Sequence, residues 1–200
     1  MATTARDRTD ARKNGNPRTY PAPAREKTPT DLTADEVKKI TDAVNPLIAD
    51  AFALYVKTKN FHWHLSGPHF RDYHLLFDEQ ADQVFESIDI MAERIRRIGG
   101  TTIRSIGHVG GLQTIDDDND EFVSADEMIA RLLADNKHIA RQQRAAIDVC
   151  SDNHDEATSN RLQEIIDDTE RRIWFLYEIT QGAQGAQGAQ GVARGSRNQR

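Results

Sequence analysis

Apolar side chains between Gly67 and Gly100 recur at alternating intervals of three and four positions. This spacing places them along one stripe of an α-helix that packs lengthwise against other helices. Pro68 predicts the start of the helix, because proline is tolerated at the first helical position, and Gly99 with Gly100 predicts its end. Such a helix is about 45 Å long at 1.5 Å per residue. The stripe comprises Phe70, Tyr73, Phe77, Ala81, Val84, Ile88, Met91, Ile95 and Ile98.

Three further long helices are predicted by the same periodicity. Thr33 and Glu36 have the spacing of a capping box before the first of them, and its apolar pattern continues through Pro46, which predicts a kink and not a stop. Ser124 and Glu127 have the same spacing before the third, and a fourth follows after a short polar break. The apolar faces comprise Val37, Ile40, Val44, Leu47, Ile48, Ala51, Leu54 and Tyr55; then Met128, Leu132, Ile139, Gln143, Ile147 and Cys150; then Leu162, Ile165, Ile166, Thr169, Ile173, Leu176 and Tyr177.

These helices predict an all-α four-helix bundle with a long connection between the second and third helices. We assign the bundle to residues 31–180. Residues 1–30 contain hardly any aliphatic side chains, and residues 181–200 repeat Gln-Gly-Ala, so we expect both ends to be disordered tails.

Charge is distributed unevenly along the chain, although its net value is only −6. Residues 1–30 hold seven basic and three acidic residues, residues 31–180 hold sixteen and twenty-nine, and residues 181–200 hold three and none. An acidic body concentrates cations, whereas basic ends can engage phosphate backbones. The lone Cys150 and the absence of an apolar run long enough for a membrane span predict a cytoplasmic protein with no membrane partner.

A polar stripe follows the apolar stripe of the second helix one residue later. It comprises His74, Asp78, Asp82, Glu86, Asp89 and Glu93. These side chains fall within about 80° of one another around the helix axis. Within the stripe, His74/Asp78 and Asp89/Glu93 are i, i+4 pairs whose side chains can reach a common point. Acids alone would indicate a solvated face, but imidazole mixed with carboxylate suits iron, manganese or zinc.

The two pairs cannot hold the same ion within one helix. Asp78 and Asp89 lie three turns apart, about 16 Å along the axis. If the pairs share a metal ion, a second copy of the helix must cross antiparallel about a two-fold axis and supply the other pair. The spacing therefore predicts a metal site between two subunits.

These residues also carry a resemblance to a known family. The run KTKNFHWHLSGPHFRDYHLLFDEQ, followed by Asp89-x-x-x-Glu93, resembles the Dps mini-ferritins, the DNA-binding proteins from starved cells, over about residues 33–180. The resemblance implies a ferritin-like bundle with a short helix in the connection between the second and third helices. It also implies an intersubunit iron site, dinuclear or mononuclear, with His62, His74 and Asp78 from one chain and Asp89 and Glu93 from the other.

The resemblance further implies a ferroxidase that oxidises Fe(II), with hydrogen peroxide the preferred oxidant in the family, and stores ferric mineral in a hollow dodecamer. Asp78 and Glu93 would be the strongest ligands, and Trp63 beside the site could serve as an electron sink, although packing alone would explain it. His64 is left out of the ligand set, because many relatives have a different polar residue there. Together with the basic tails, the resemblance predicts non-specific DNA binding and a nucleoid-associated location.

Two alternatives remain at this stage. A true ferritin would hold two irons inside one bundle through Glu-x-x-His motifs, and the sequence contains none. A structural DNA-compaction protein with vestigial metal chemistry would explain the basic tails but not the ligand row. We expect the acidic run 116–121 to be a solvated loop, Asp135 and His138 to lie at the surface, and Asp152, Asp155 and Glu156 to be candidates for an iron-entry pore.

Overall fold

The structure is a computed structural model that describes the backbone of residues 28–195 and the side chains of residues 28–181. Within this range every element of regular secondary structure is a helix, as predicted. The helices are α1 (Ala34–His64), α2 (Phe70–Arg97), α3 (Ile106–Leu112), α4 (Ala125–Asp152) and α5 (Glu156–Gly195). The predicted four long helices and the short helix in the long connection are confirmed.

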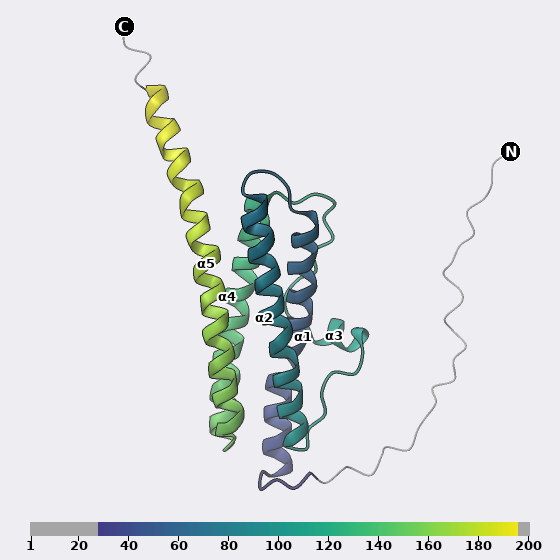
Figure 1. Ribbon diagram of the computed structural model, residues 1–200. Coiled ribbons are helices and arrows are strands. Elements are labelled where there is room, and N and C mark those ends of the chain that lie inside the picture. Colours follow the sequence, from purple (N-terminus) through teal and green to yellow (C-terminus); the bar gives the residue numbers. More distant parts are fainter. Residues whose placement is uncertain (1–27, 196–200) are drawn as a thin grey trace, which may run out of the picture.

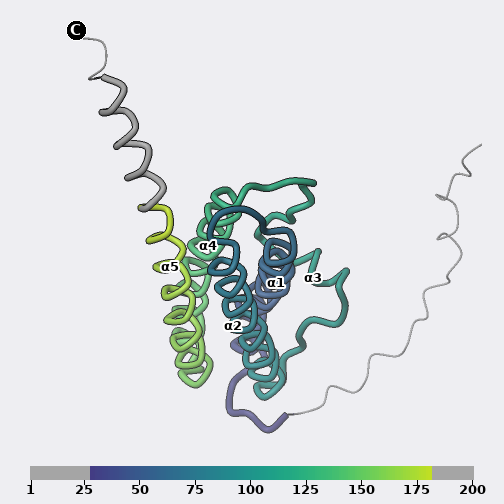
Figure 2. Tube along the Cα trace, turned by 45° about the horizontal axis from the view of Figure 1, so that its top comes forward, coloured from purple at the N-terminus to yellow at the C-terminus, as the bar shows by residue number. Residues whose placement is uncertain are grey.

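The long helices pack as two antiparallel hairpins, α1 with α2 and α4 with α5 (Figure 1). The connection from α2 to α4 runs the length of the bundle, so these two helices point in the same direction. Contacts of α1 with α4 and of α2 with α5 close the bundle, and α3 lies outside it against α1 (Figure 2). Most of the apolar side chains predicted from the sequence meet along the axis between the four helices. Phe70 and Tyr177 are exceptions, because both are exposed in the single chain.

Capping and proline behave largely as the sequence predicted. The Thr33 hydroxyl accepts a hydrogen bond from the Glu36 N–H, and the Glu36 carboxylate accepts one from the Thr33 N–H at 2.7 Å. The helix then continues through Pro46. At α4, the Ser124 hydroxyl accepts from the Glu127 N–H, but the Glu127 carboxylate accepts a bond from Arg131 and not from the cap.

The predicted start of α2 at Pro68 is wrong. His69 adopts a left-handed conformation with φ 61°, which an α-helix cannot contain, so the helix begins at Phe70. Gly67, at φ 98°, lies in the same tight turn. This turn reverses the chain between α1 and α2 and so brings residues near 62 and 74 together.

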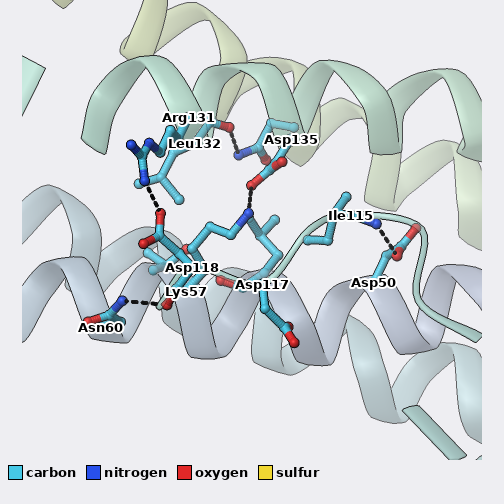
Figure 3. A network of polar contacts seen from close by, with 12 residues as sticks. Asp50, Lys57, Asn60, Ile115, Asp117, Asp118, Arg131, Leu132 and Asp135 are labelled. Atoms are coloured by element: carbon cyan, nitrogen blue, oxygen red, sulfur yellow. Dashed lines mark hydrogen bonds and ion pairs between the residues drawn. The ribbon is translucent and has the colours of Figure 1, made fainter. Parts of the chain in front are cut away.

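Buried carboxylates anchor the long connection to the bundle, and Figure 3 shows this network. Asp50, fully buried on α1, accepts hydrogen bonds from the N–H groups of Thr114 and Ile115. Asp118 pairs with Arg131 at 2.7 Å, and its backbone carbonyl accepts a bond from Asn60. The acidic run is therefore not simply a solvated loop, because Asp118 has a side chain that is only 3% exposed and compensated by an arginine.

Two other sequence-based expectations are also corrected. Asp135 is not a surface group: it lies 2.6 Å from Lys57 with little exposure, and burial raises the pKa of the Asp135 carboxyl. Asp155, a candidate pore residue, is buried, pairs with Arg94 at 2.9 Å and accepts a bond from the Thr158 N–H. Both carboxylates hold helices together, since their partners come from other elements of the bundle.

The tail predicted over residues 1–30 falls almost wholly outside the described range, whereas the backbone of most of the tail predicted over residues 181–200 lies inside it. Residues 1–27 and 196–200 lie outside it, as do the side chains from residue 182 onward. The backbone of α5 continues as helix to Gly195, into the Gln-Gly-Ala tract. None of the helices described is both long and apolar enough to cross a membrane.

Gly100 closes the end of α2 at a point where no side chain fits. A Cβ atom there would lie 2.4 Å from the Thr41 hydroxyl and 2.8 Å from Ile95 Cγ2. We therefore expect Gly100→Ala to lower the free energy of unfolding by about 1–3 kcal/mol through overpacking. Thermal unfolding measures the effect. Gly110→Ala, where a Cβ would meet open space, is the matched control, and an equal loss in both variants would contradict the packing argument.

Candidate metal centre

The end of α1 and the first turns of α2 bring two predicted ligands into direct contact. The imidazole rings of His62 and His74 stack with centroids 3.7 Å apart and planes inclined by 20°. His62 Nδ1 lies 2.9 Å from the backbone oxygen of His74, and His74 Nδ1 lies 3.0 Å from the backbone oxygen of His62. Phe70 stacks on the other side of His74, with centroids 5.1 Å apart. Each histidine thus bonds the backbone of the other one's helix.

These two hydrogen bonds determine which nitrogen of each ring can bind a metal ion. A carbonyl oxygen only accepts hydrogen bonds, so Nδ1 of each ring must carry the proton. In the neutral imidazole, Nε2 then keeps its lone pair. Orientation of a metal-binding histidine by a bond from its other nitrogen is the usual arrangement in metal sites. Both rings are therefore held in the tautomer that ligation through Nε2 requires.

Asp78 lies beside His62 at the mouth of this pair. Its Oδ1 is 3.8 Å from His62 Nε2 and 2.5 Å from Lys59 Nζ. The hydrogen bond from Lys59, followed by the attraction of its charge and of the two histidines, lowers the pKa of the Asp78 carboxyl. The same contact raises the pKa of Lys59. The carboxylate is thus kept ionised, as metal ligation requires.

The spacing of His62 and Asp78 would allow these two side chains to share a transition-metal ion. Two ligand atoms that share an ion at about 2.1 Å each are separated by at most about 4.2 Å. The 3.8 Å between His62 Nε2 and Asp78 Oδ1 lies within that limit. The side chain of His62 is only 11% exposed, whereas that of Asp78 is 45% exposed. An ion bound by these two atoms would contact the protein on one side only, and its other coordination positions would be open.

Asp89 and Glu93 lie further along α2 and do not join this group within one chain. Both residues are exposed, and Glu93 bonds Arg97 on its own helix at 2.5 Å. Among the residues described, no three His, Cys, Asp or Glu side chains come close enough to hold a metal ion. We call His62, His74 and Asp78 the half-site, because the sequence predicts all three as ligands and the structure places them together without completing a metal site.

Two predicted neighbours of the half-site point elsewhere. Trp63 is 65% exposed on the outer side of α1. His64, also exposed, uses its Nδ1 to bond the Asn60 carbonyl of its own helix, so leaving it out of the ligand set agrees with its position.

Lys59 is the neighbour of the half-site that sequence reasoning missed. The sequence could have identified it, because Lys59 lies one turn before His62 on the same predicted helix.

Comparisons with known proteins assign the chain to a family. A model of the ferritin-like domain matches residues 41–185. A DNA protection during starvation protein of Brevibacillus brevis is 32% identical over 66% of this chain and 89% of its own length. The chain belongs to the Dps family. An uncharacterised low temperature-induced protein of Nostoc is also 32% identical, over 76% of this chain and 85% of its own. The structure of DpsC from Streptomyces coelicolor superposes with a TM-score of 0.75 at 28% identity, covering 78% of this chain and 91% of that one.

The interior of this Dps bundle differs from the site expected for a true ferritin. Between α4 and α5 lies the guanidinium of Arg172, which donates hydrogen bonds to Asn136 Oδ1 at 2.9 Å and to Thr169 Oγ1 at 2.8 Å. Burial lowers the pKa of Arg172 to about 10. A buried cation surrounded by neutral partners opposes the entry of a metal ion. The bundle interior is therefore unsuited to the intrasubunit alternative.

The crossed histidine bonds predict a difference between two neighbouring histidines. His74→Ala removes one ring of the stack and leaves the His62 carbonyl without its donor, so we expect the free energy of unfolding to fall by about 1–3 kcal/mol. His64→Ala removes only an exposed bond within α1 and should change it by less than about 0.5 kcal/mol. Chemical denaturation of the metal-free protein measures both. Equal losses would mean that the crossed bonds do not stabilise the α1–α2 contact.

Proposed function

We propose that this protein is a ferroxidase and iron-storage protein whose iron site lies between two subunits. The observation that carries the proposal is the half-site: His62 stacks on His74 and has its Nε2 3.8 Å from Asp78 Oδ1. Asp89 lies on the same helix as Asp78 but about 16 Å away along the axis. An antiparallel crossing of two α2 helices would bring the missing pair to each half-site. A two-fold dimer would then contain two equivalent sites.

An apolar groove on α1 supports association with a second copy. Val56, Trp63 and Ile106 are 59%, 65% and 80% exposed in the single chain. They line one groove between α1, α3 and the acidic loop. Large apolar side chains gathered in this way mark interaction surfaces. By analogy with the family, we propose that such dimers assemble further into a hollow dodecamer.

The chemistry assigned to this site treats iron as the substrate. Neutral imidazoles and ionised carboxylates bind Fe(II) and favour Fe(III) even more, because the carboxylates supply negative charge. One hydrogen peroxide accepts two electrons, one from each of two Fe(II) ions, and its oxygen atoms leave as water or enter the ferric oxide. We propose Trp63, the residue after His62 in the chain, as an electron sink, although its side chain points away from the half-site in the single chain. Removal of Fe(II) together with peroxide would protect nearby DNA from hydroxyl radicals.

Mixing two inactive variants tests the intersubunit arrangement. Asp78→Ala and Glu93→Ala should each abolish most iron oxidation. In a mixed dimer, however, one site would receive both damaged residues and the other would receive neither. Random co-assembly makes half of the dimers mixed, so about a quarter of all sites should regain activity. Stopped-flow absorbance of ferric product, with Fe(II) and peroxide, measures the recovery.

The control for this experiment is a double variant that carries both substitutions in one chain, co-assembled with an Asp78→Ala chain. No intact site can then form, and activity should stay at the background level. If the mixture of single variants also stays at background although mixed particles form, the ligands do not come from two subunits.

We propose non-specific DNA binding as a second function, because the charge distribution favours it. The acidic body should repel a duplex, so the basic segments 1–30 and 181–200 must supply any attraction. Each chain carries few such charges, but a multimeric particle presents many copies, and multivalency raises avidity by about 10²–10⁴. Binding of this kind would be consistent with a nucleoid-associated protein. If the protein were instead a purely structural DNA-compaction protein, replacing the ligand residues would not change its rate of iron oxidation.

Removal of the two segments tests this second function. We expect a particle without residues 1–30 and 181–200 to lose its gel shift with duplex DNA while it keeps its rate of iron oxidation. For the full chain, the gel shift should weaken steeply as salt rises, because it depends on counterion release. An unchanged gel shift after truncation at the same salt would mean that a surface of the bundle binds DNA.

A further inference from the structure

A lysine lies within the half-site, in contact with the aspartate that would bind iron. Lys59 Nζ lies 2.5 Å from Asp78 Oδ1, and the Lys59 side chain is only 17% exposed. His62, one turn further along α1, approaches the same oxygen with its Nε2 at 3.8 Å. An ammonium group and a metal-binding nitrogen thus converge on one carboxylate oxygen.

A metal ion on this oxygen would compete directly with the ammonium group. An ion about 2.1 Å from Oδ1 could be at most about 4.6 Å from Lys59 Nζ in its present position. Two positive charges at that distance repel strongly, and more so where side chains are partly buried. The ion and the ammonium group therefore cannot both hold Asp78 Oδ1 without a large loss of binding energy.

We propose that Lys59 is a specificity-determining residue that acts as a tethered competitor of the metal ion at Asp78. The inference rests on the proposed function, since it takes Asp78 as an iron ligand. Without iron, the ammonium group neutralises Asp78 and stabilises the empty half-site. When Fe(II) binds, Lys59 is displaced toward solvent and toward Asp82, one turn further along α2, whose charge already attracts it. The site then fills only when the concentration of divalent ions is high enough to displace the lysine.

Other lysines of α1 make contacts of different kinds, and one provides a matched control. Lys57 pairs with the buried Asp135 of α4, so its replacement would disturb the bundle. Lys38 pairs with Asp42 one turn away on the same helix, with both side chains largely exposed. The Lys38 pair has the same two chemical groups as the Lys59 pair but no metal-binding histidine beside it. Lys38→Gln therefore controls for the loss of a lysine and of an ion pair on α1.

The test uses the full-length protein and Co(II), which occupies Fe(II) sites without being oxidised under the conditions of the measurement. Isothermal titration calorimetry should give about tenfold or higher affinity for Co(II) in Lys59→Gln than in the wild type, because a competing charge has been removed. Lys59→Arg keeps the charge and should show no gain, and Lys38→Gln should match the wild type. Thermal unfolding gives an independent readout: Lys59→Gln should be less stable than the wild type without Co(II) and show the larger rise in Tm when Co(II) is added.

The outcomes separate this inference from the proposed function. If wild-type binding depends on Asp78 but Lys59→Gln binds no more tightly, the competitor role is wrong and the proposed iron site stands. If neither protein binds Co(II), and Asp78→Ala behaves identically, both are wrong. A Lys59→Gln protein that binds Co(II) where the wild type does not would support both the site and its control by the lysine.

Discussion

The contact on which the half-site depends is the pair of crossed hydrogen bonds between the two stacked histidines. Each imidazole donates from Nδ1 to the backbone carbonyl of the other residue. The bonds join the last turn of α1 to the first turns of α2, so they fix the hairpin and the ring orientations at once. A single arrangement thereby stabilises the fold and leaves Nε2 of His62 and of His74 available for a ligand.

Positive and negative charges are arranged so that the bundle is stable without metal. Asp78 is compensated by Lys59, and Glu93 by Arg97. Inside the bundle, the buried carboxylates Asp50 and Asp135 are satisfied by backbone N–H groups and by a lysine. Asp82, Glu86 and Asp89, in contrast, lie on the exposed face of α2. The paired charged groups therefore stabilise the fold, whereas the exposed carboxylates of α2 are available to cations.

This chain differs from a true ferritin in where its candidate ligands lie. In the present bundle the interior holds mainly apolar side chains, and its buried charged groups, Arg172 among them, are bound to other protein groups. The histidines and carboxylates lie instead at the edge of the α1–α2 hairpin. On the function proposed here, assembly and metal binding would depend on the same face of the molecule.

The sequence alone determined the number of long helices and most of their apolar faces, because period and capping are local properties of the chain. It did not determine the end of α5, which continues to Gly195. It also placed His74 and Asp78 on one face of α2 and showed that Asp89 cannot join them there. The tertiary structure decided what depends on long-range contacts: the bond between His62 and His74, the approach of Lys59 to Asp78, and the burial of Asp155. It also moved the start of α2 beyond Pro68, since the left-handed conformation of His69 is required by the reversal of the chain. Periodicity describes which face a residue occupies on its own helix, whereas the partner of a charged group is set by the packing of another helix against that face.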